Sequence, residues 1–136
     1  MTANEYLSQV YNLKRKTKYN LVRLEELREL AFSISGTAFD RIPSGTRNVE
    51  APFAKTIERI IDQEAEIQRE IEELERKQKE IQMTIELLPD VDCRFVLLYR
   101  YMQGMTWENI ALEMHAGIST VKRWHRKWLD KIKVPQ

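Results

Sequence analysis

The chain has 136 residues, of which 43% are hydrophobic and 32% are charged, and its formal net charge is +1. This length suits one domain, or a small domain with an appendage. Four Gly and four Pro are too few for a β-sandwich or barrel, which needs a turn about every 8–12 residues. The single cysteine, Cys93, excludes an internal disulfide, and no apolar run approaches the roughly 20 residues of a membrane span. We therefore expect a soluble, intracellular, all-α protein.

The near-neutral total conceals an uneven distribution of charge. Residues 56–88 carry five basic and ten acidic side chains, a net charge of −5. Residues 118–135 carry six basic side chains and only Asp130, a net charge of +5. The sequence thus has an acidic middle and a basic end, which indicates that the end is the part suited to a polyanion.

The first 34 residues show the spacing of an amphipathic helix. Their apolar positions step by three and four: Tyr6, Val10, Leu13, Thr17, Asn20 or Leu21, Leu24, Leu27 and Ala31. The next segment, 35–55, contains Gly36, Pro43, Ser44, Gly45 and Asn48. This composition predicts a loop of about 20 residues, which is long by the usual range of four to six.

The longest regular pattern follows, and Pro52 just ahead of it is typical of a helix start. The pattern is a heptad seam over more than four heptads: Ile57, Ile60, Glu64, Ile67, Ile71, Leu74, Gln78, Ile81, Ile85 and Leu88. Such a narrow stripe needs a partner helix. The simplest partner is the first helix, which predicts a long, coiled-coil-like antiparallel hairpin over residues 1–88. Pairing between two chains, as in a homodimer, is the rival.

Pro89 breaks the pattern, and three shorter helical segments are predicted after it, forming a second domain over residues 89–136. Asp90 is expected to cap the first segment, Val91 to Met102, which places Phe95, Leu98, Tyr99 and Met102 on one face. Gly104 is suited to a left-handed turn, and Thr106 to capping Trp107–Met114. The third segment is predicted from Ile118 to Lys133, after a tight turn at His115-Ala116-Gly117.

Two short helices, a tight turn and a basic final helix are the components of a helix-turn-helix. Val121 comes ten residues after Ala111, where an apolar residue anchors the recognition helix. The buried stripe is predicted to continue through Trp124 or His125, Trp128 and Ile132. Short hydroxyls and long cations on the other face are suited to base edges and phosphates. The predicted DNA-binding residues are Ser119, Thr120, Lys122, Arg123, Arg126 and Lys127.

The segments Thr106–Ala111 and Thr120–Arg123, followed by the basic tail, resemble region 4 of bacterial sigma factors. The whole layout is similar to that of the ArpU/RinA-like late transcription regulators of phages and prophages. Phe39-Asp40-Arg41-Ile42 with Pro43-Ser44-Gly45 matches a loop of those relatives. The turn departs from the pattern, because His115 stands where Gly is usual, and we expect Gly117 to carry the unusual dihedral instead.

This resemblance implies a sequence-specific DNA-binding transcription regulator of phage or prophage origin, activating late genes in the cytoplasm of a bacterial host cell. Its partner would be double-stranded DNA, with no membrane. One alternative is a sigma-like accessory factor that binds RNA polymerase. A less favoured one is a packaging protein like the small terminase subunit, in which the DNA-binding helices usually come first.

Other chemistry is weakly represented. His115 and His125 have no Cys or carboxylate cluster at ligand spacing, and no base is identifiable that would activate Cys93. We expect no enzyme, no cofactor and no metal. Trp107, Trp124 and Trp128 are expected in the core rather than stacked on bases. The basic run Lys14–Lys18 is expected to be a solvated helix face, with a second DNA-backbone contact as the alternative.

Overall fold

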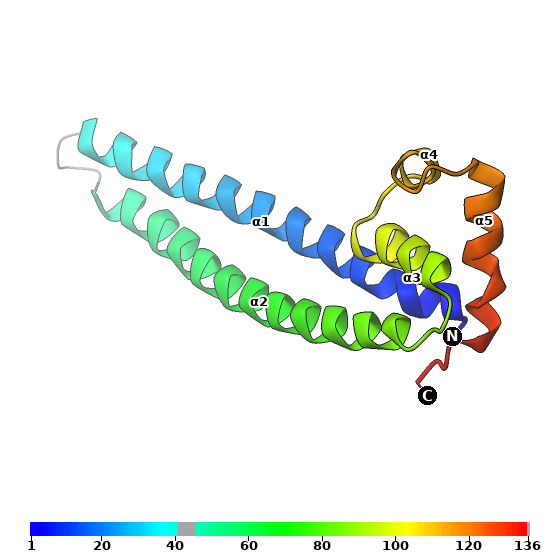
Figure 1. Cartoon of the computed structure of the whole chain (residues 1–136). Helices are drawn as coiled ribbons and strands as arrows, with labels where there is room; N and C mark the ends of the chain where they lie inside the picture. The colour runs from blue at the N-terminus through cyan, green and yellow to red at the C-terminus, as the bar shows by residue number, and fades with distance from the viewer. Residues whose placement is uncertain (41–45, 136) are drawn as a thin grey trace. The chain divides into compact units, whose positions relative to one another are not determined.

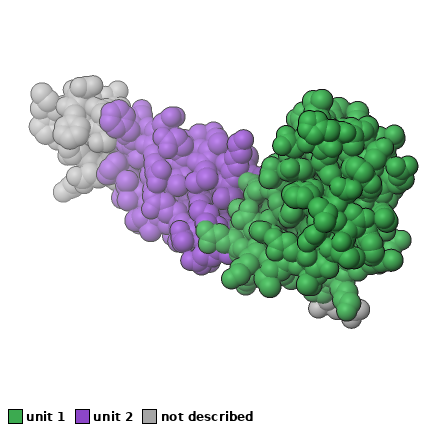
Figure 2. Space-filling model, in the orientation of Figure 1, with its two compact units in different colours: residues 1–14, 73–136 green, residues 15–72 purple. Residues whose placement is uncertain are grey.

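The computed structural model describes residues 1–40 and 46–135, with side chains for 1–34 and 51–135 (Figure 1). Every regular element of the described residues is helical, so the all-α prediction is confirmed. Two long helices come first, α1 (Ala3–Asp40) and α2 (Thr46–Glu86). The residues form two compact units, one of residues 1–14 with 73–136 and one of residues 15–72 (Figure 2). The units meet after Lys14 and after Glu72, whereas the sequence suggested one boundary after Leu88.

The predicted loop over 35–55 is wrong for most of its length. The backbone is helical as far as Asp40 and again from Thr46, so Pro52 lies inside α2 rather than at its start. A proline in a helix removes one backbone hydrogen bond. Next to it, the Thr56 hydroxyl donates to the Pro52 carbonyl at 2.8 Å, within one turn of α2. The Phe39-Asp40-Arg41-Ile42 and Pro43-Ser44-Gly45 segments lie outside the residues whose side chains are described.

The unit of residues 15–72 is a helical hairpin, and its core pairs α1 with α2. The buried side chains are Leu24, Ala31, Ile60 and Ile67, with Leu27, Phe53, Ile57 and Ile71 packed around them. Asn20 is half-buried, whereas Leu21 is exposed, which settles the choice between them in the α1 stripe. The isoleucine seam therefore finds its partner within the chain.

The buried carboxylate among the described side chains of this hairpin is Glu70, not the seam residue Glu64. Glu64 is exposed and pairs with Arg28 at 3.1 Å. Glu70 is only 3% exposed, and both of its carboxylate oxygens accept from the Asn20 amide, at 2.7 and 3.0 Å. Lys16 lies 3.8 Å from the same carboxylate. This buried carboxylate ties one position of α2 to one position of α1.

The unit of residues 1–14 and 73–136 has its own core, to which the first turns of α1 and the last turns of α2 contribute. Its buried side chains are Tyr6, Leu7, Val10, Ile81, Ile85, Leu88, Cys93, Leu97, Tyr101 and Ile132. Lys14 donates from Nζ to the Met102 carbonyl at 2.7 Å, so this lysine binds backbone within the unit. The two termini lie close together here (Figure 1).

Three α-helices of this unit form the predicted helix-turn-helix region: α3 (Val91–Leu97), α4 (Trp107–Glu113) and α5 (Ile118–Lys127). A π-helix, η1 (Leu98–Met102), extends α3, and a 3-10 turn, η2 (Leu129–Lys131), follows α5. The third helix is therefore shorter than predicted, because it ends at Lys127 instead of Lys133. The buried face of α3 also differs from the expected set, since Cys93, Val96 and Leu97 are buried while Phe95 is 46% exposed.

Candidate nucleic-acid interface

The α4–turn–α5 segment is held by a small core of its own. Val121 is fully buried, together with Val96 of α3 and with Ile110 and Ala111 of α4. Trp107 and Trp124 are half-buried and pack against this cluster. The predicted anchoring role of Val121 is thus confirmed as a packing position. It fixes one face of α5 against α3 and α4 and leaves the opposite face to solvent.

The caps that start α3 and α4 are those expected from the sequence. Asp90 accepts from the backbone N–H of Cys93 at 3.2 Å, and Thr106 accepts from that of Asn109 at 3.2 Å. Each side chain satisfies an amide that the first turn of a helix leaves without a partner. Gly104 has φ +65°, the left-handed turn predicted for it.

The turn between α4 and α5 differs from the prediction at one residue. His115 itself takes the left-handed conformation, with φ +52°, and Gly117 has an ordinary φ of −74° as the residue before α5. A non-glycine residue in this region is disfavoured by contacts of its Cβ. The expectation that Gly117 would carry the unusual dihedral is therefore wrong.

Most of the predicted DNA-binding side chains are brought together on the solvent face of α5. Thr120 is half-buried, and the others are exposed: Ser119, Lys122, Arg123, Arg126 and Lys127. Lys131 and Lys133 follow as exposed cations beyond the end of the helix. The result is a hydroxyl at the first turn of α5 and a series of cations further along it.

Lys127 differs from the other cations because its partner is a carboxylate, whereas Lys131 lies over the Trp128 ring, with its Nζ 4.4 Å from the ring centroid. Its Nζ lies 3.1 Å from Oδ2 of Asp90, which also accepts from Trp128 Nε1 at 3.2 Å. Hydrogen bonds from Lys127, from the Trp128 indole and from the Cys93 backbone hold the pKa of Asp90 below its usual value. Asp90 thus joins the start of α3 to the end of α5, and Lys127 is engaged in that junction.

An aromatic and polar cluster behind α5 was not anticipated from the sequence. The Tyr101 hydroxyl donates to Asn4 Oδ1 at 2.7 Å. The oxygen of this hydroxyl also lies 2.6 Å from Nε2 of His125. The His125 ring stacks on Tyr101 and meets Trp107 edge-on, with centroids 5.6 and 4.9 Å apart. These contacts connect α1, η1, α4 and α5. The Asn4–Tyr101 contact joins residues 97 positions apart, which helical periodicity does not reveal.

The charge on His125 is suppressed by its surroundings. Burial lowers the pKa of His125 to about 4, and the nearby cations Arg100 and Arg126 act in the same direction. Tyr101 is buried as well, which raises its pKa to about 12. Near neutral pH both rings are therefore neutral, and His125 holds α5 against η1 and α4 by its hydrogen bond and stacking with Tyr101 and its edge-on contact with Trp107.

Cys93 is buried, and its Sγ donates to the Trp124 carbonyl at 3.1 Å. Burial and the neighbouring Asp90 raise the pKa of its thiol to about 11. A thiol in this state is a poor nucleophile at neutral pH. Its role in the structure is to fill space between α3 and α5.

The described residues also bear on other classes of site. No group of three or more His, Cys, Asp or Glu side chains is placed to hold a metal ion in residues 1–34 and 51–135. Among the helices that the structure describes, none is long and apolar enough to cross a bilayer.

Comparison with known proteins gives one match. No curated protein and no solved structure matches the chain. A family model described as "Protein of unknown function (DUF722)" matches residues 11–134, which run from within α1 to the residues after η2. This match covers most of the sequence, including α4 and α5, and the chain belongs to the DUF722 family.

Proposed function

We propose that this protein binds double-stranded DNA and reads its sequence with α5 in the major groove. The observation that carries the proposal is the two-sided character of α5. Val121 is fully buried against α3 and α4, while Ser119, Lys122, Arg123 and Arg126 are exposed on the rest of the helix surface. A rigidly held helix with cations outward is the arrangement that major-groove recognition requires.

The roles within α5 follow from the reach of each side chain. Ser119 lies in the first turn of the helix and Arg123 in the second, within the part that meets base edges in helix-turn-helix proteins. A guanidinium is suited to guanine because it donates two hydrogen bonds to O6 and N7. Arg126, Lys131 and Lys133 lie further along and would contact phosphates, which supply sequence-independent affinity.

We further propose that the DNA target is a promoter region and that the protein regulates transcription, activating late genes of a phage or prophage in the bacterial cytoplasm. The support is the similarity of Thr106–Ala111 and Thr120–Arg123 to sigma-factor region 4. These segments correspond to the start of α4 and the first turns of α5, with Thr106 as the α4 cap.

The proposal is tested by selecting bound duplexes from a random pool and titrating the chosen site by fluorescence anisotropy. The Arg123→Ala variant is expected to weaken binding by about 1–3 kcal/mol, roughly 5- to 150-fold, and to relax the preference at one base pair. Arg76→Ala is the matched control, since Arg76 is equally an exposed arginine but lies on α2.

Three results would count against the proposal. An Arg123→Ala affinity equal to wild type would reject base reading by that residue. Absence of any selected DNA, together with capture of core RNA polymerase, would favour the polymerase-binding alternative. A ring of eight or more subunits by light scattering would favour the packaging alternative.

A further inference from the structure

The hairpin of residues 15–72 carries a groove that lies outside α5. Its volume is about 640 Å³. Both helices contribute to its walls, α1 through Arg23 and Leu27 and α2 through Arg59, Asp62, Gln63, Ala65, Glu66 and Arg69. Three guanidinium groups and two carboxylates therefore share one concave surface.

The charges in this groove are not all neutralised. Arg69 is paired with Glu66 at 2.6 Å. The hydrogen bond and the positive charge of Arg69 lower the pKa of the Glu66 carboxyl. Arg23 and Arg59 have no carboxylate within 4.0 Å among the side chains of residues 1–34 and 51–135. By contrast, Arg28 of the same hairpin contacts both Glu25 and Glu64. Among the described side chains, the unpaired charges of the groove are thus two guanidinium groups, Arg23 and Arg59, and one carboxylate, Asp62.

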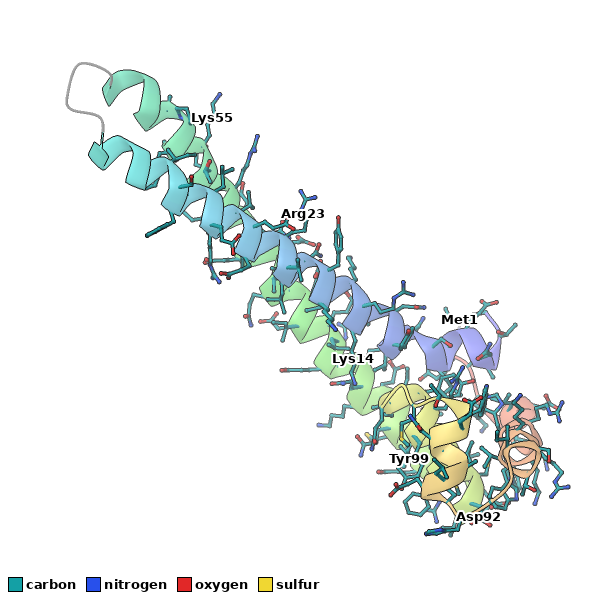
Figure 3. All side chains as sticks on the ribbon, turned by 90° about the horizontal axis from the view of Figure 1, so that it is seen from above. Met1, Lys14, Arg23, Lys55, Asp92 and Tyr99 are labelled. Atoms are coloured by element: carbon teal, nitrogen blue, oxygen red, sulfur yellow. The ribbon has the colours of Figure 1, made fainter. Side chains whose placement is uncertain are left out.

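A second hollow extends the positive surface along α2. It has a volume of about 300 Å³ and is lined by Ala51, Pro52, Lys55 and Arg59, so Arg59 belongs to both. Lys55 lies one helical turn before Arg59. Figure 3 shows the labelled Lys55 and Arg23 side chains projecting on the same side of the hairpin. We name Arg23, Lys55 and Arg59 the hairpin cation row.

We propose that the hairpin cation row binds phosphate groups of the DNA backbone, as a second and sequence-independent contact of this protein with DNA. Phosphate is the chemistry that suits it, because a guanidinium donates parallel hydrogen bonds to two phosphate oxygens. The row consists of cations at intervals along two helices, which fits a polyanion of repeated charges better than a single small anion. Asp62 in the groove opposes such a ligand and keeps the contact weak. This inference rests on the proposed DNA binding by α5.

The test compares the salt dependence of DNA binding in wild type and in the double variant Arg23→Ala/Arg59→Ala. Each phosphate contact contributes about 0.9 to the slope of log K against log salt. The double variant is therefore expected to reduce the slope by about 1.8, equally on the selected site and on a scrambled duplex. Asp62→Asn is expected to raise the affinity on both duplexes at low salt.

Arg28→Ala is the matched control, because Arg28 lies on the same hairpin but is already paired with Glu25 and Glu64. The salt slope of this variant is expected to equal that of wild type. Urea unfolding of each variant verifies that the hairpin is intact. An unchanged slope in the double variant, with Arg123→Ala still losing base preference, overturns the hairpin contact and leaves DNA reading by α5 standing. A wild-type protein that binds neither duplex overturns both proposals.

Discussion

Lys127 illustrates how one carboxylate changes the role of a residue in a basic helix. It was predicted to bind DNA, yet its ammonium lies 3.1 Å from Asp90. The side chains of Lys127 and Asp90 are 57% and 19% exposed, so the pair is partly solvated and its net stabilisation is small. A phosphate would have to replace Asp90 before it gained this contact.

We therefore expect Lys127→Ala to weaken DNA binding less than Arg126→Ala does. The free energy of unfolding of the Lys127→Ala variant should fall by no more than about 1 kcal/mol, as is usual for the loss of an exposed ion pair. Anisotropy titrations at one salt concentration, with urea unfolding in parallel, give both quantities. Equal losses of affinity in the two variants would show that Lys127 contacts DNA in spite of Asp90.

His125 predicts a specific dependence of stability on pH. Its pKa is about 4 in the folded chain, against an ordinary value of 6.5. Between these values the unfolded chain binds a proton that the folded chain does not, so stability falls as the pH falls from about 6.5 to about 4. Above pH 6.5 the residue is neutral in both states and contributes no pH dependence. The charged groups facing it, Arg100 and Arg126, act in the same direction as burial.

The measurement is urea unfolding at several pH values for wild type and His125→Gln. Carboxylates contribute to the acid response of both proteins, so the difference between them isolates the histidine. The variant should lose less stability than wild type between pH 6.5 and 4. Parallel curves for the two proteins would show that the pKa of His125 is the same in the folded and the unfolded chain, which contradicts the prediction.

At the scale of the element, the hairpin depends on a polar residue outside its apolar seam. Glu70 is 3% exposed and is satisfied by Asn20, whose amide reaches both carboxylate oxygens. An alternative register of α1 against α2 would separate these groups and leave a buried carboxylate without donors, which is costly. Glu70 therefore favours one register in the part of the hairpin where it lies.

Glu70→Ala is expected to lower the free energy of unfolding by about 1–3 kcal/mol, because it leaves the Asn20 amide without its acceptor and opens space in the interface. Glu70→Gln should lose less, since its amide oxygen still accepts from Asn20. Glu73→Ala, an exposed glutamate on the same helix, should stay within about 0.5 kcal/mol of wild type. A Glu70→Ala variant as stable as Glu73→Ala would contradict the role given to this carboxylate.

Much of each helix could be predicted from periodicity and caps, but the helix ends could not. The seam and the Thr106 cap depend on neighbours in sequence: the cap forms as expected, and the seam lies on α2 from Ile57 to Ile85, except that Glu64 is exposed and Leu88 follows the end of the helix. Pro52 is typical of a helix start because proline lacks an amide hydrogen, yet α2 continues through it. The last predicted turn of α5 is absent, because the chain leaves the helix at Trp128, whose indole N–H is bound to Asp90.

At the scale of the whole molecule, α3, η1 and Ile132 share a core with the first turns of α1 and the last turns of α2. Tyr6 and Leu7 of α1 and Ile81 and Ile85 of α2 are buried in the same cluster as Leu97. The compact unit is accordingly residues 1–14 with 73–136, not 89–136. Long-range contacts of this kind depend on tertiary packing. Neither this shared core nor the Asn4–Tyr101–His125 cluster could therefore be predicted from the spacing of residues in the sequence.

A fragment of residues 89–136 is therefore expected not to unfold cooperatively. Removing residues 1–88 exposes the buried faces of Cys93, Leu97 and Tyr101, and so takes away most of the apolar burial that stabilises the unit. Urea titration followed by circular dichroism is the measurement, with the full chain as control. A fragment with a sharp transition and full DNA affinity would show that the last three helices fold without the hairpin.

The buried Cys93 has a consequence for experiment. It is the only thiol of the chain, and it lies where α3 meets α5, donating to the Trp124 carbonyl. A thiol reagent can reach it only when these helices separate, so its labelling rate measures how often α5 separates from α3. The native protein thus carries a chemical reporter of α5 docking, and DNA that holds α5 in place should slow the labelling.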